Sequence, residues 1–241
     1  MNKIDILEIP IHSLTMEQAV EEVDSFVRVG GFHSVFTPNP EIIMLAQEDK
    51  EMASILQNAD LVVPDGIGVV IASKILKTPT LPERVPGFDL IQNTMKQGVD
   101  KGYKYYFLGG KPGVAELAKE KMCEKYPDIE IVGYHDGYFK EEDMPKIIED
   151  INASRANILL VCLGAPKQEK WIHAYKDQLP YIRVAIGAGG SLDGMAGIVP
   201  RAPEIFQKCG LEWFYRLLKQ PSRWKRMLVI PVFVGKVIRK R

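Results

Sequence analysis

The stretch YKYYFLGGKPGVAELAKEKMCEKY, residues 103–126, decides the fold class. It opens with a short apolar and aromatic run, Tyr103–Leu108, of the kind that forms a buried β-strand. Glycines follow, and a helical pattern then runs from Pro112 to Tyr126, with Pro112 expected at the first helical position. A strand, a glycine turn and a helix in succession form the repeating unit of a layered α/β sheet.

The same alternation recurs along most of the chain. Five more apolar runs are expected to be strands: His33–Thr37, Ala59–Val63, Ile129–Gly133, Ile158–Leu163 and Ile182–Ile186. Helices are expected at Met16–Val29 with Thr15 as N-cap, Pro40–Gln47, Gly68–Leu76, Phe88–Gly98, Glu141–Ala153 and Lys167–Gln178. This pattern predicts a Rossmann-like, mainly parallel sheet with helices on both faces. Ligands of such sheets bind at the carboxyl ends of the strands, so the loops there are the candidate site.

The composition excludes several other classes of protein. Of 241 residues, 46% are apolar and 26% are charged, which is unlike a disordered chain, a collagen-like repeat or a polytopic membrane protein. The three cysteines, Cys123, Cys162 and Cys209, are far apart, so we expect no disulfide framework or structural zinc site, and a reducing compartment. Asp5 and Glu8 interrupt the apolar core that a signal peptide needs, so secretion is not expected.

The charge is unevenly distributed, although basic and acidic residues both number 31. Residues 201–241 hold eleven basic and two acidic residues, a net charge of +9, which leaves −9 on residues 1–200. Trp213, Trp224 and the apolar run Met227–Val234 lie among these basic groups. Such interleaving is typical of helices at a membrane interface, and the apolar run is too short to span a bilayer. Two alternatives stay open: a helix packed on the body with its basic residues in solvent, and contact with nucleic acid.

Two prolines in the segment Gly197–Pro203 indicate a linker into this tail. We therefore expect a Rossmann-like catalytic domain at residues 1–196 and a basic, amphipathic helical appendage at residues 197–241 that associates with an anionic membrane surface. We favour this surface over nucleic acid as the partner. The apolar tail also allows homo-oligomers to form away from the membrane.

Polar residues follow the first two expected strands. Thr37 and Asn39 lie among prolines at a strand–helix junction, where they either serve a site or form a rigid turn with an N-cap. Asp65 follows the next strand, and it either caps the following helix or acts as a general base that takes a proton from a sugar hydroxyl.

Glycine-rich turns follow the later strands. The turn Gly109-Gly110-Lys111 precedes a helix N-terminus, which suits a phosphate or nucleotide contact as well as a structural turn. Tyr138 is a candidate for a base or ribose contact, and Asp193 either accepts a hydrogen bond from ribose or uracil or is a turn aspartate. Together these loops favour a nucleotide-linked substrate over a small apolar ligand.

The loops, read in order, resemble a known family. The segments that carry the resemblance are TPNPE (37–41), ADLVVPDGIG (59–68), ERVPGFDL (83–90), FLGG (107–110), LGAPKQEKW (163–171), GAGGSLDGMAG (187–197), VPRAPE (199–204) and EWFYRL (212–217). They resemble the WecG/TagA/CpsF glycosyltransferases (glycosyltransferase family 26) through nearly the whole chain, and the TagA branch most. The family is Rossmann-like, metal-independent and inverting.

The resemblance implies a UDP-sugar-dependent hexosyltransferase. Enzymes of the TagA branch move N-acetylmannosamine from UDP-ManNAc to undecaprenyl-diphosphate-linked GlcNAc, an early step of wall teichoic acid synthesis. Other branches use other donors, so UDP-ManNAcA and UDP-glucose remain alternatives. The implied partners are a UDP-sugar and a polyprenyl-diphosphate-linked acceptor, and the implied location is cytoplasmic and peripheral on the inner face of the cell membrane.

The resemblance also implies roles for particular residues. Asp65 matches the proposed base, Thr37 lies beside it in the acceptor pocket, and Arg84 and Gln168 match active-site polar residues. Three tail arginines match residues thought to meet the diphosphate: Arg216, Arg223 and Arg226. The chain has no Asp-x-Asp motif to hold a metal, so we expect arginines and backbone N–H groups to stabilise the departing UDP, with no metal or other cofactor.

Two rival classes fit the sequence less well. A nicotinamide-linked oxidoreductase needs a complete GxGxxG, whereas Gly66-x-Gly68 is followed by Ile71 in place of the third glycine. A non-catalytic membrane-binding adaptor would use the basic tail, but it leaves Asp65 and Arg84 at the strand ends unexplained.

Overall fold

The computed structural model describes residues 2–77, 79–203, 205–206, 211–219, 224 and 228–240. Its centre is a parallel sheet with the strand order β4-β3-β8-β7-β5-β6. The strands are β3 (His33–Phe36), β4 (Leu61–Val62), β5 (Lys104–Gly109), β6 (Glu130–His135), β7 (Ile158–Cys162) and β8 (Val184–Gly187). All six strands expected from the sequence are therefore confirmed, with small differences at their ends.

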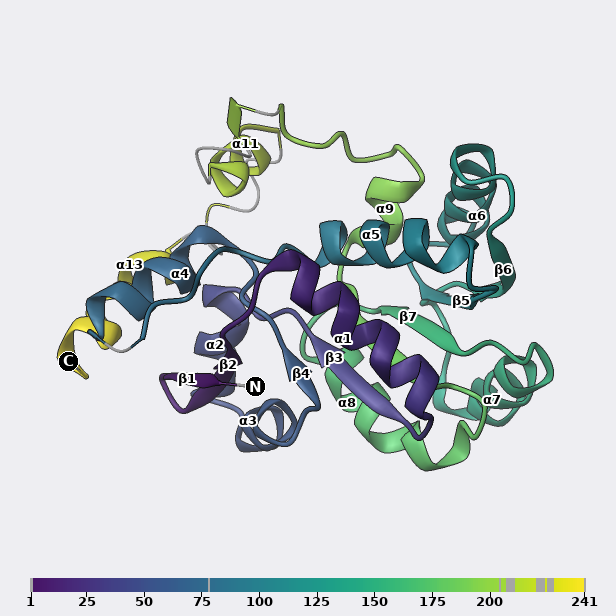
Figure 1. Cartoon of the computed structure of the whole chain (residues 1–241), viewed down its shortest axis with the longest axis horizontal. Coiled ribbons are helices and arrows are strands. Elements are labelled where there is room, and N and C mark those ends of the chain that lie inside the picture. The colour runs from purple at the N-terminus through teal and green to yellow at the C-terminus, as the bar shows by residue number, and fades with distance from the viewer. Residues whose placement is uncertain are drawn as a thin grey trace.

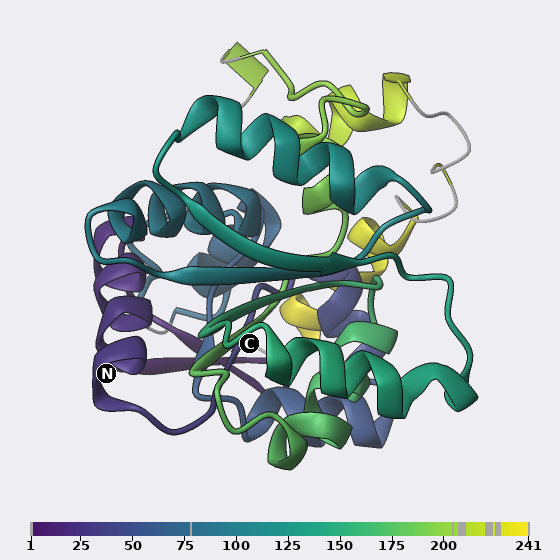
Figure 2. The same ribbon diagram turned by 90° about the vertical axis from the view of Figure 1, so that its right-hand side faces the viewer.

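Helices cover both faces of this sheet (Figures 1 and 2). One face packs against α1 (Met16–Val29), α5 (Gly87–Val99), α6 (Val114–Lys125) and α9 (Ser191–Met195). The other face packs against α2 (Pro40–Ala46), α3 (Lys50–Gln57), α4 (Ile67–Ile75), α7 (Met144–Ala153), α8 (Lys167–Tyr175) and α13 (Val229–Arg239). The 3₁₀ turns η1 (Glu141–Asp143) and η2 (Lys176–Gln178) precede α7 and follow α8. The Rossmann-like architecture expected from the sequence is confirmed.

Two elements near the N-terminus were not expected. They are a hairpin of β1 (Lys3–Ile6) and β2 (Ile9–His12), and helix α3. The hairpin turn is formed by Leu7 and Glu8, which both have a positive φ, 52° and 69°. Asn and Gly are the usual residues there, so the sequence carries no turn signal.

The start of α6 corrects another expectation. Pro112 is not the first helical residue, because the helix begins at Val114 with Gly113 as its N-cap. Gly113 has a left-handed backbone, φ 84° and ψ −17°, which a right-handed helix cannot include. The two residues therefore form the turn that leads into the helix.

The last helix, α13, packs on the body of the protein. Phe233 and Val237 are fully buried, and the helix lies against α2 and α4 (Figure 1). Lys240 Nζ also lies 3.0 Å from Asp5 Oδ1 in the hairpin strand β1. The body-packing alternative therefore holds for α13, while Leu228 and Val232 remain more than half exposed. Within the described ranges, no helix is both long and apolar enough to cross a bilayer.

One buried histidine joins the hairpin to the edge of the main sheet. The His12 side chain is 2% exposed, and its Nδ1 accepts a hydrogen bond of 2.9 Å from the backbone N–H of Val62 in β4. Burial, helped by the charge of Lys3, lowers the pKa of His12 to about 4. The folded protein therefore holds this ring neutral.

Acid should weaken the fold through His12. An unfolded histidine has a pKa of about 6.5, so the unfolded chain binds a proton between pH 6.5 and 4 that the folded chain does not. Proton binding by the unfolded chain therefore lowers the free energy of unfolding as the pH falls from about 6.5 toward 4. The total loss from His12 is on the order of 3 kcal/mol. In urea unfolding at pH 7.5 and 5, His12→Asn should lose less stability on acidification than the parent protein. His173→Asn, at an exposed histidine, is the matched control. An equal loss in His12→Asn and the parent would contradict this role.

Candidate active site

The pairing of β3 and β4 continues beyond their last residues. Val63 N donates to Phe36 O at 2.9 Å, and Asp65 N donates to Pro38 O at 3.2 Å. Val85 N then donates to Pro64 O at 2.8 Å. Three loops that are distant in sequence therefore run side by side at the carboxyl edge of the sheet. They carry three of the predicted site residues: Thr37, Asp65 and Arg84.

Thr37 lies against the first residue of α5. A Cβ atom added at Gly87 would come within 2.6 Å of Thr37 Oγ1, so glycine is needed for this approach. The Thr37 side chain therefore meets the N-terminus of a thirteen-residue helix. The N–H groups in the first turn of a helix produce a positive potential, which favours negative charge near the hydroxyl.

Asp65 is half-buried at the tip of β4. It is not the cap of α4, because Gly66 (φ 92°) holds that position and no side chain caps the helix. The capping alternative for Asp65 is therefore wrong. Asn39, in contrast, is the N-cap of α2: its side chain accepts from Ile42 N at 3.0 Å, as the turn-and-cap alternative predicts.

Arg84 is paired with the C-terminal segment. Its Nη1 lies 2.5 Å from Oε2 of Glu212, the first residue of α11 (Glu212–Lys219), and both side chains are about one-fifth exposed. A second pair, Arg201 with Asp89 in the first turn of α5, lies nearby. Burial first, and then the charge of Glu212, raise the pKa of Asp89 against the lowering effect of both arginines. These four groups form a single cluster that joins the segment after α9 to the strand-tip edge.

Gln168 is almost fully buried at the start of α8. Its Oε1 accepts a hydrogen bond of 2.9 Å from Gly189 N, and its Nε2 donates at 2.9 Å to Oε1 of Glu169. A Cβ atom at Gly187, the last residue of β8, would come within 3.1 Å of Gln168 Nε2. The amide therefore lies over the tip of β8, which is the strand next to β3.

The glycine turn after β5 packs closely on β7. A Cβ atom at Gly109 would come within 2.3 Å of Cys162 O, so only glycine fits there. Gly110 N donates to the same oxygen at 3.2 Å, and Gly110 O accepts from Gly137 N at 2.8 Å. The N–H of Gly110 therefore already has an acceptor within the fold, while Lys111 is exposed.

A hollow of about 220 Å³ lies beside this turn. Its lining comes from the start of α6 and the end of β6: Gly113, Ala115, Glu116, Tyr134, His135 and Asp136. Tyr138 is 70% exposed in the same loop, and Asp193 is half-buried in the first turn of α9. Two acidic residues line the hollow, so it suits a hydroxyl-bearing group such as a ribose better than a phosphate.

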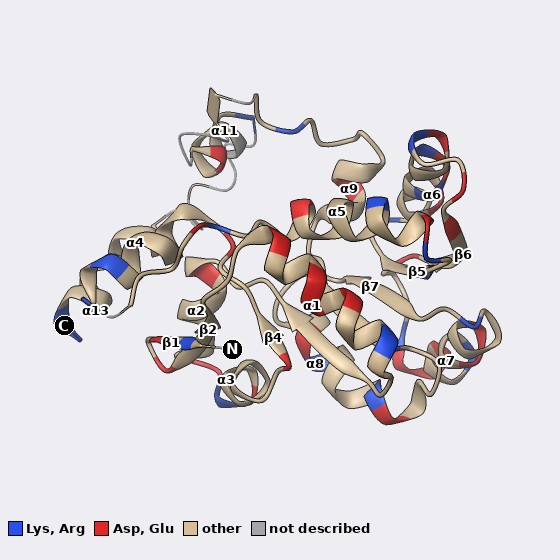
Figure 3. Cartoon of the chain, in the orientation of Figure 1, with Lys and Arg blue, Asp and Glu red and all other residues tan. Residues whose placement is uncertain are grey.

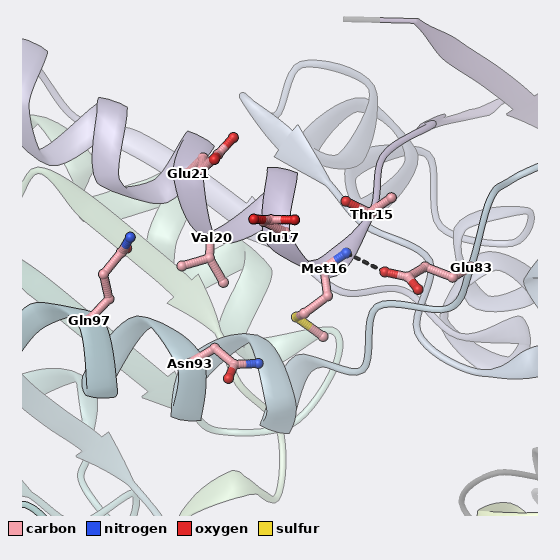
Figure 4. A pocket seen from close by; sticks show the side chains of 8 residues that line it. All are labelled: Thr15, Met16, Glu17, Val20, Glu21, Glu83, Asn93 and Gln97. Carbon is pink, nitrogen blue, oxygen red and sulfur yellow. Dashed lines mark hydrogen bonds between the residues drawn. The ribbon is translucent and has the colours of Figure 1, made fainter.

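A larger cavity of about 620 Å³ lies between α1 and α5 (Figure 4). It is lined by Thr15, Met16, Glu17, Val20, Glu21, Glu83, Asn93 and Gln97. Glu83 Oε1 accepts from Met16 N at 2.5 Å, which satisfies an N-terminal N–H group of α1. The lining includes three carboxylates, Glu17, Glu21 and Glu83, which disfavour a phosphate-bearing ligand in this cavity. Figure 3 shows the acidic residues along α1.

The three tail arginines are only partly within the structure. Arg216 belongs to α11, whereas Arg223 and Arg226 lie outside the described residues.

Sequence reasoning missed Glu212 and Asp89. The signal for Glu212 was its rarity, because it is one of only two acids in the basic tail. Within the described ranges, no group of three or more His, Cys, Asp or Glu side chains is placed to hold a metal ion.

Comparison with known proteins identifies the class. The model of the "Glycosyl transferase WecG/TagA/CpsF family" matches residues 4–241, so the chain belongs to this glycosyltransferase family. Among its curated relatives is a protein of Bacillus spizizenii, 37% identical over 99% of this chain and 90% of the relative. A Bacillus subtilis protein is 36% identical over 86% of this chain and 79% of its own length. A Staphylococcus aureus protein is 35% identical over 99% of this chain and 93% of its own length. All three are named N-acetylglucosaminyldiphosphoundecaprenol N-acetyl-beta-D-mannosaminyltransferase.

The ion pair between Arg84 and Glu212 should hold α11 against the body. Glu212→Gln removes its charge, which should weaken docking by about 1 kcal/mol and raise the rate of tryptic cleavage within residues 211–219 about fivefold. Glu142→Gln is the matched control, because its partner Lys140 lies on the open surface. Equal cleavage rates in Glu212→Gln and the control would contradict a docking role.

Proposed function

We propose that this protein transfers N-acetylmannosamine from UDP-ManNAc to GlcNAc on undecaprenyl diphosphate, with inversion and without a divalent metal. The relatives are named as N-acetylmannosaminyltransferases acting on N-acetylglucosaminyldiphosphoundecaprenol, and they match this chain over most of their own length. The observation that carries the proposal is the position of Asp65, which lies at a strand tip beside the Thr37 loop and does not cap α4. Other UDP-sugars, such as UDP-ManNAcA or UDP-glucose, remain the alternative donors.

Asp65 is the proposed general base. A carboxylate at this edge removes the proton from the acceptor hydroxyl, whose oxygen attacks the anomeric carbon as the bond to UDP breaks. Attack from the face opposite the leaving group inverts the configuration. Thr37 follows β3, and the Gln168 amide lies over the tip of the neighbouring strand β8; both are proposed to orient the sugars. A positioned base of this kind contributes roughly 10²–10⁴-fold to the rate.

The departing UDP needs positive charge. Arg84 is the proposed donor of that charge from the body, where a bound diphosphate would compete with Glu212 for its guanidinium. The tail is proposed to add further positive charge for the departing UDP through Arg216, Arg223 and Arg226. At the other end of the edge, the turn from Gly109 to Lys111 is proposed to hold the nucleotide.

Three further side chains are proposed to bind substrate. They are Asn39, Tyr138 and Asp193, which follow β3, β6 and β8 in the chain. Asn39 Oδ1 is occupied as the cap of α2, so its amide nitrogen is the atom proposed for the sugar. The hollow beside β6 supports a place for the ribose or base near Tyr138.

Residues 197–241 are the proposed membrane-associating segment. Large apolar side chains are exposed on α11 and α13, including Trp213, Phe214, Leu218, Val232 and Ile238. Basic residues accompany them, as Figure 3 shows at the end of α13. This arrangement supports a peripheral position on the inner face of the membrane, next to the proposed lipid-linked acceptor. Since Phe233 and Val237 are buried, α13 also anchors the segment to the catalytic domain.

Replacement of the proposed base tests the site. Asp65→Asn keeps the shape of the side chain and removes its basicity, so kcat for transfer to a short-chain lipid-diphosphate GlcNAc should fall about 10²–10⁴-fold. Asp128→Asn, an exposed aspartate just before β6 at the opposite edge, is the matched control. The assay is run across a panel of UDP-sugars, with and without EDTA. Near-parental turnover by Asp65→Asn would rule out this base, and loss of turnover in EDTA would rule out the metal-free mechanism.

Replacement of exposed apolar residues tests the membrane surface. The triple variant Leu228→Ser, Val232→Ser, Ile238→Ser leaves the buried side chains of α13 in place. Its affinity for vesicles containing phosphatidylglycerol should fall at least about tenfold in a sedimentation assay, because apolar burial is lost. Val29→Ser, at a 78% exposed valine on α1, is the control. If the triple variant binds as tightly as the control, this face does not meet the membrane.

A further inference from the structure

Glu169 is a buried carboxylic acid for which the proposed mechanism has no use. It lies in the first turn of α8 and is 1% exposed. Its Oε2 atom has no hydrogen-bond partner among the described residues. Burial raises the pKa of this carboxyl, against the lowering effect of hydrogen bonds from the Gln168 amide and from its own backbone N–H. A buried carboxyl with an unpaired oxygen costs stability, and such groups are expected mainly at functional sites.

The usual structural role of such a residue is not possible here. A glutamate at the third position of a helix commonly accepts a hydrogen bond from the N-cap backbone N–H. The N-cap of α8 is Pro166, which has no N–H. Glu169 therefore cannot form a capping box.

Glu169 instead helps to fix which way the Gln168 amide points. Gln168 Nε2 donates to Glu169 Oε1, and Gln168 Oε1 accepts from Gly189 N, both at 2.9 Å. Rotating the amide by 180° would place two donors face to face at Gly189 and would bring the amide oxygen against Glu169 Oε1, which is an acceptor in the present arrangement. The two contacts together therefore select one amide orientation.

The amide held in this way belongs to the row of strand tips. It packs against Gly187, where a Cβ atom would come within 3.0 Å of Phe36 as well as 3.1 Å of Gln168 Nε2. Phe36 pairs with Gly187 across β3 and β8 and directly precedes Thr37. Among the described residues, the second Nε2 hydrogen of Gln168 has no protein acceptor.

We propose that Glu169 is a positioning residue for sugar transfer: it accepts one hydrogen of the Gln168 amide and leaves the other to donate to the sugar nucleotide. This inference rests on the proposed function. The role requires an acceptor oxygen at residue 169 and does not require a negative charge. Glutamine can therefore replace Glu169, whereas an apolar residue of similar size cannot.

Steady-state kinetics with UDP-ManNAc and a short-chain lipid acceptor tests the role. Glu169→Gln should keep kcat within about threefold of the parent, because its amide oxygen still accepts. Glu169→Leu should lower kcat about 10- to 100-fold, because a misoriented amide misplaces the sugar. Thermal melting checks that each variant folds, and Glu169→Met replaces the leucine variant if that one does not. Parental kcat in Glu169→Leu, or an equal loss in Glu169→Gln, overturns the proposal.

A double-mutant cycle separates positioning from structural damage. In a Gln168→Ala background, Glu169→Leu should have no further effect on kcat, because the residue acts only through that amide. An additional loss equal to that of the single variant overturns the inference. If Asp65→Asn and Gln168→Ala lose activity while Glu169→Leu does not, this inference alone fails. Full activity in Asp65→Asn would instead remove the proposed base on which the function depends.

Discussion

Backbone hydrogen bonds that extend the pairing of β3 and β4 hold the residues of the proposed site in place. Phe36 O, Pro38 O and Pro64 O each accept from a neighbouring loop, so the loops lie in register beyond the strands themselves. The register gives Thr37 and Asp65 fixed positions relative to each other. Backbone pairing is much stiffer than two side chains on free loops, and a rigid site is what proton removal from a sugar hydroxyl requires.

The same edge receives the C-terminal segment through charge. Arg84 and Asp89 on the body meet Glu212 and Arg201, and all four are at least partly shielded from water. Phe233 anchors α13 to the body separately. The C-terminal segment is therefore attached at two places, by the ion pair of Glu212 at the start of α11 and by the buried face of α13. The segment that carries exposed aromatic side chains is thus connected directly to a proposed catalytic arginine. The proposed membrane contact and the proposed diphosphate site therefore involve neighbouring groups.

Local sequence patterns predicted the main strands and several helices, whereas features that depend on distant pairing were missed. The six strands were found because each is a short apolar run in a buried parallel sheet, and Thr15 was found because it caps α1. The β1–β2 hairpin was missed because Leu7 and Glu8 give no turn signal. The pair of Arg84 with Glu212 spans 128 residues, so no local pattern could reveal it. The strand-end position of Asp65 made it a candidate, and family resemblance supplied Gln168, but the position of the Gln168 amide needed the fold.

A structure of the protein with UDP bound tests the proposed site most directly. We expect the diphosphate to lie at the carboxyl edge of the sheet, near Arg84. The space next to its β-phosphate should place an acceptor hydroxyl oxygen about 3 Å from a carboxylate oxygen of Asp65. A nucleotide bound instead in the cavity between α1 and α5, beside Glu17 and Glu21, would contradict that placement.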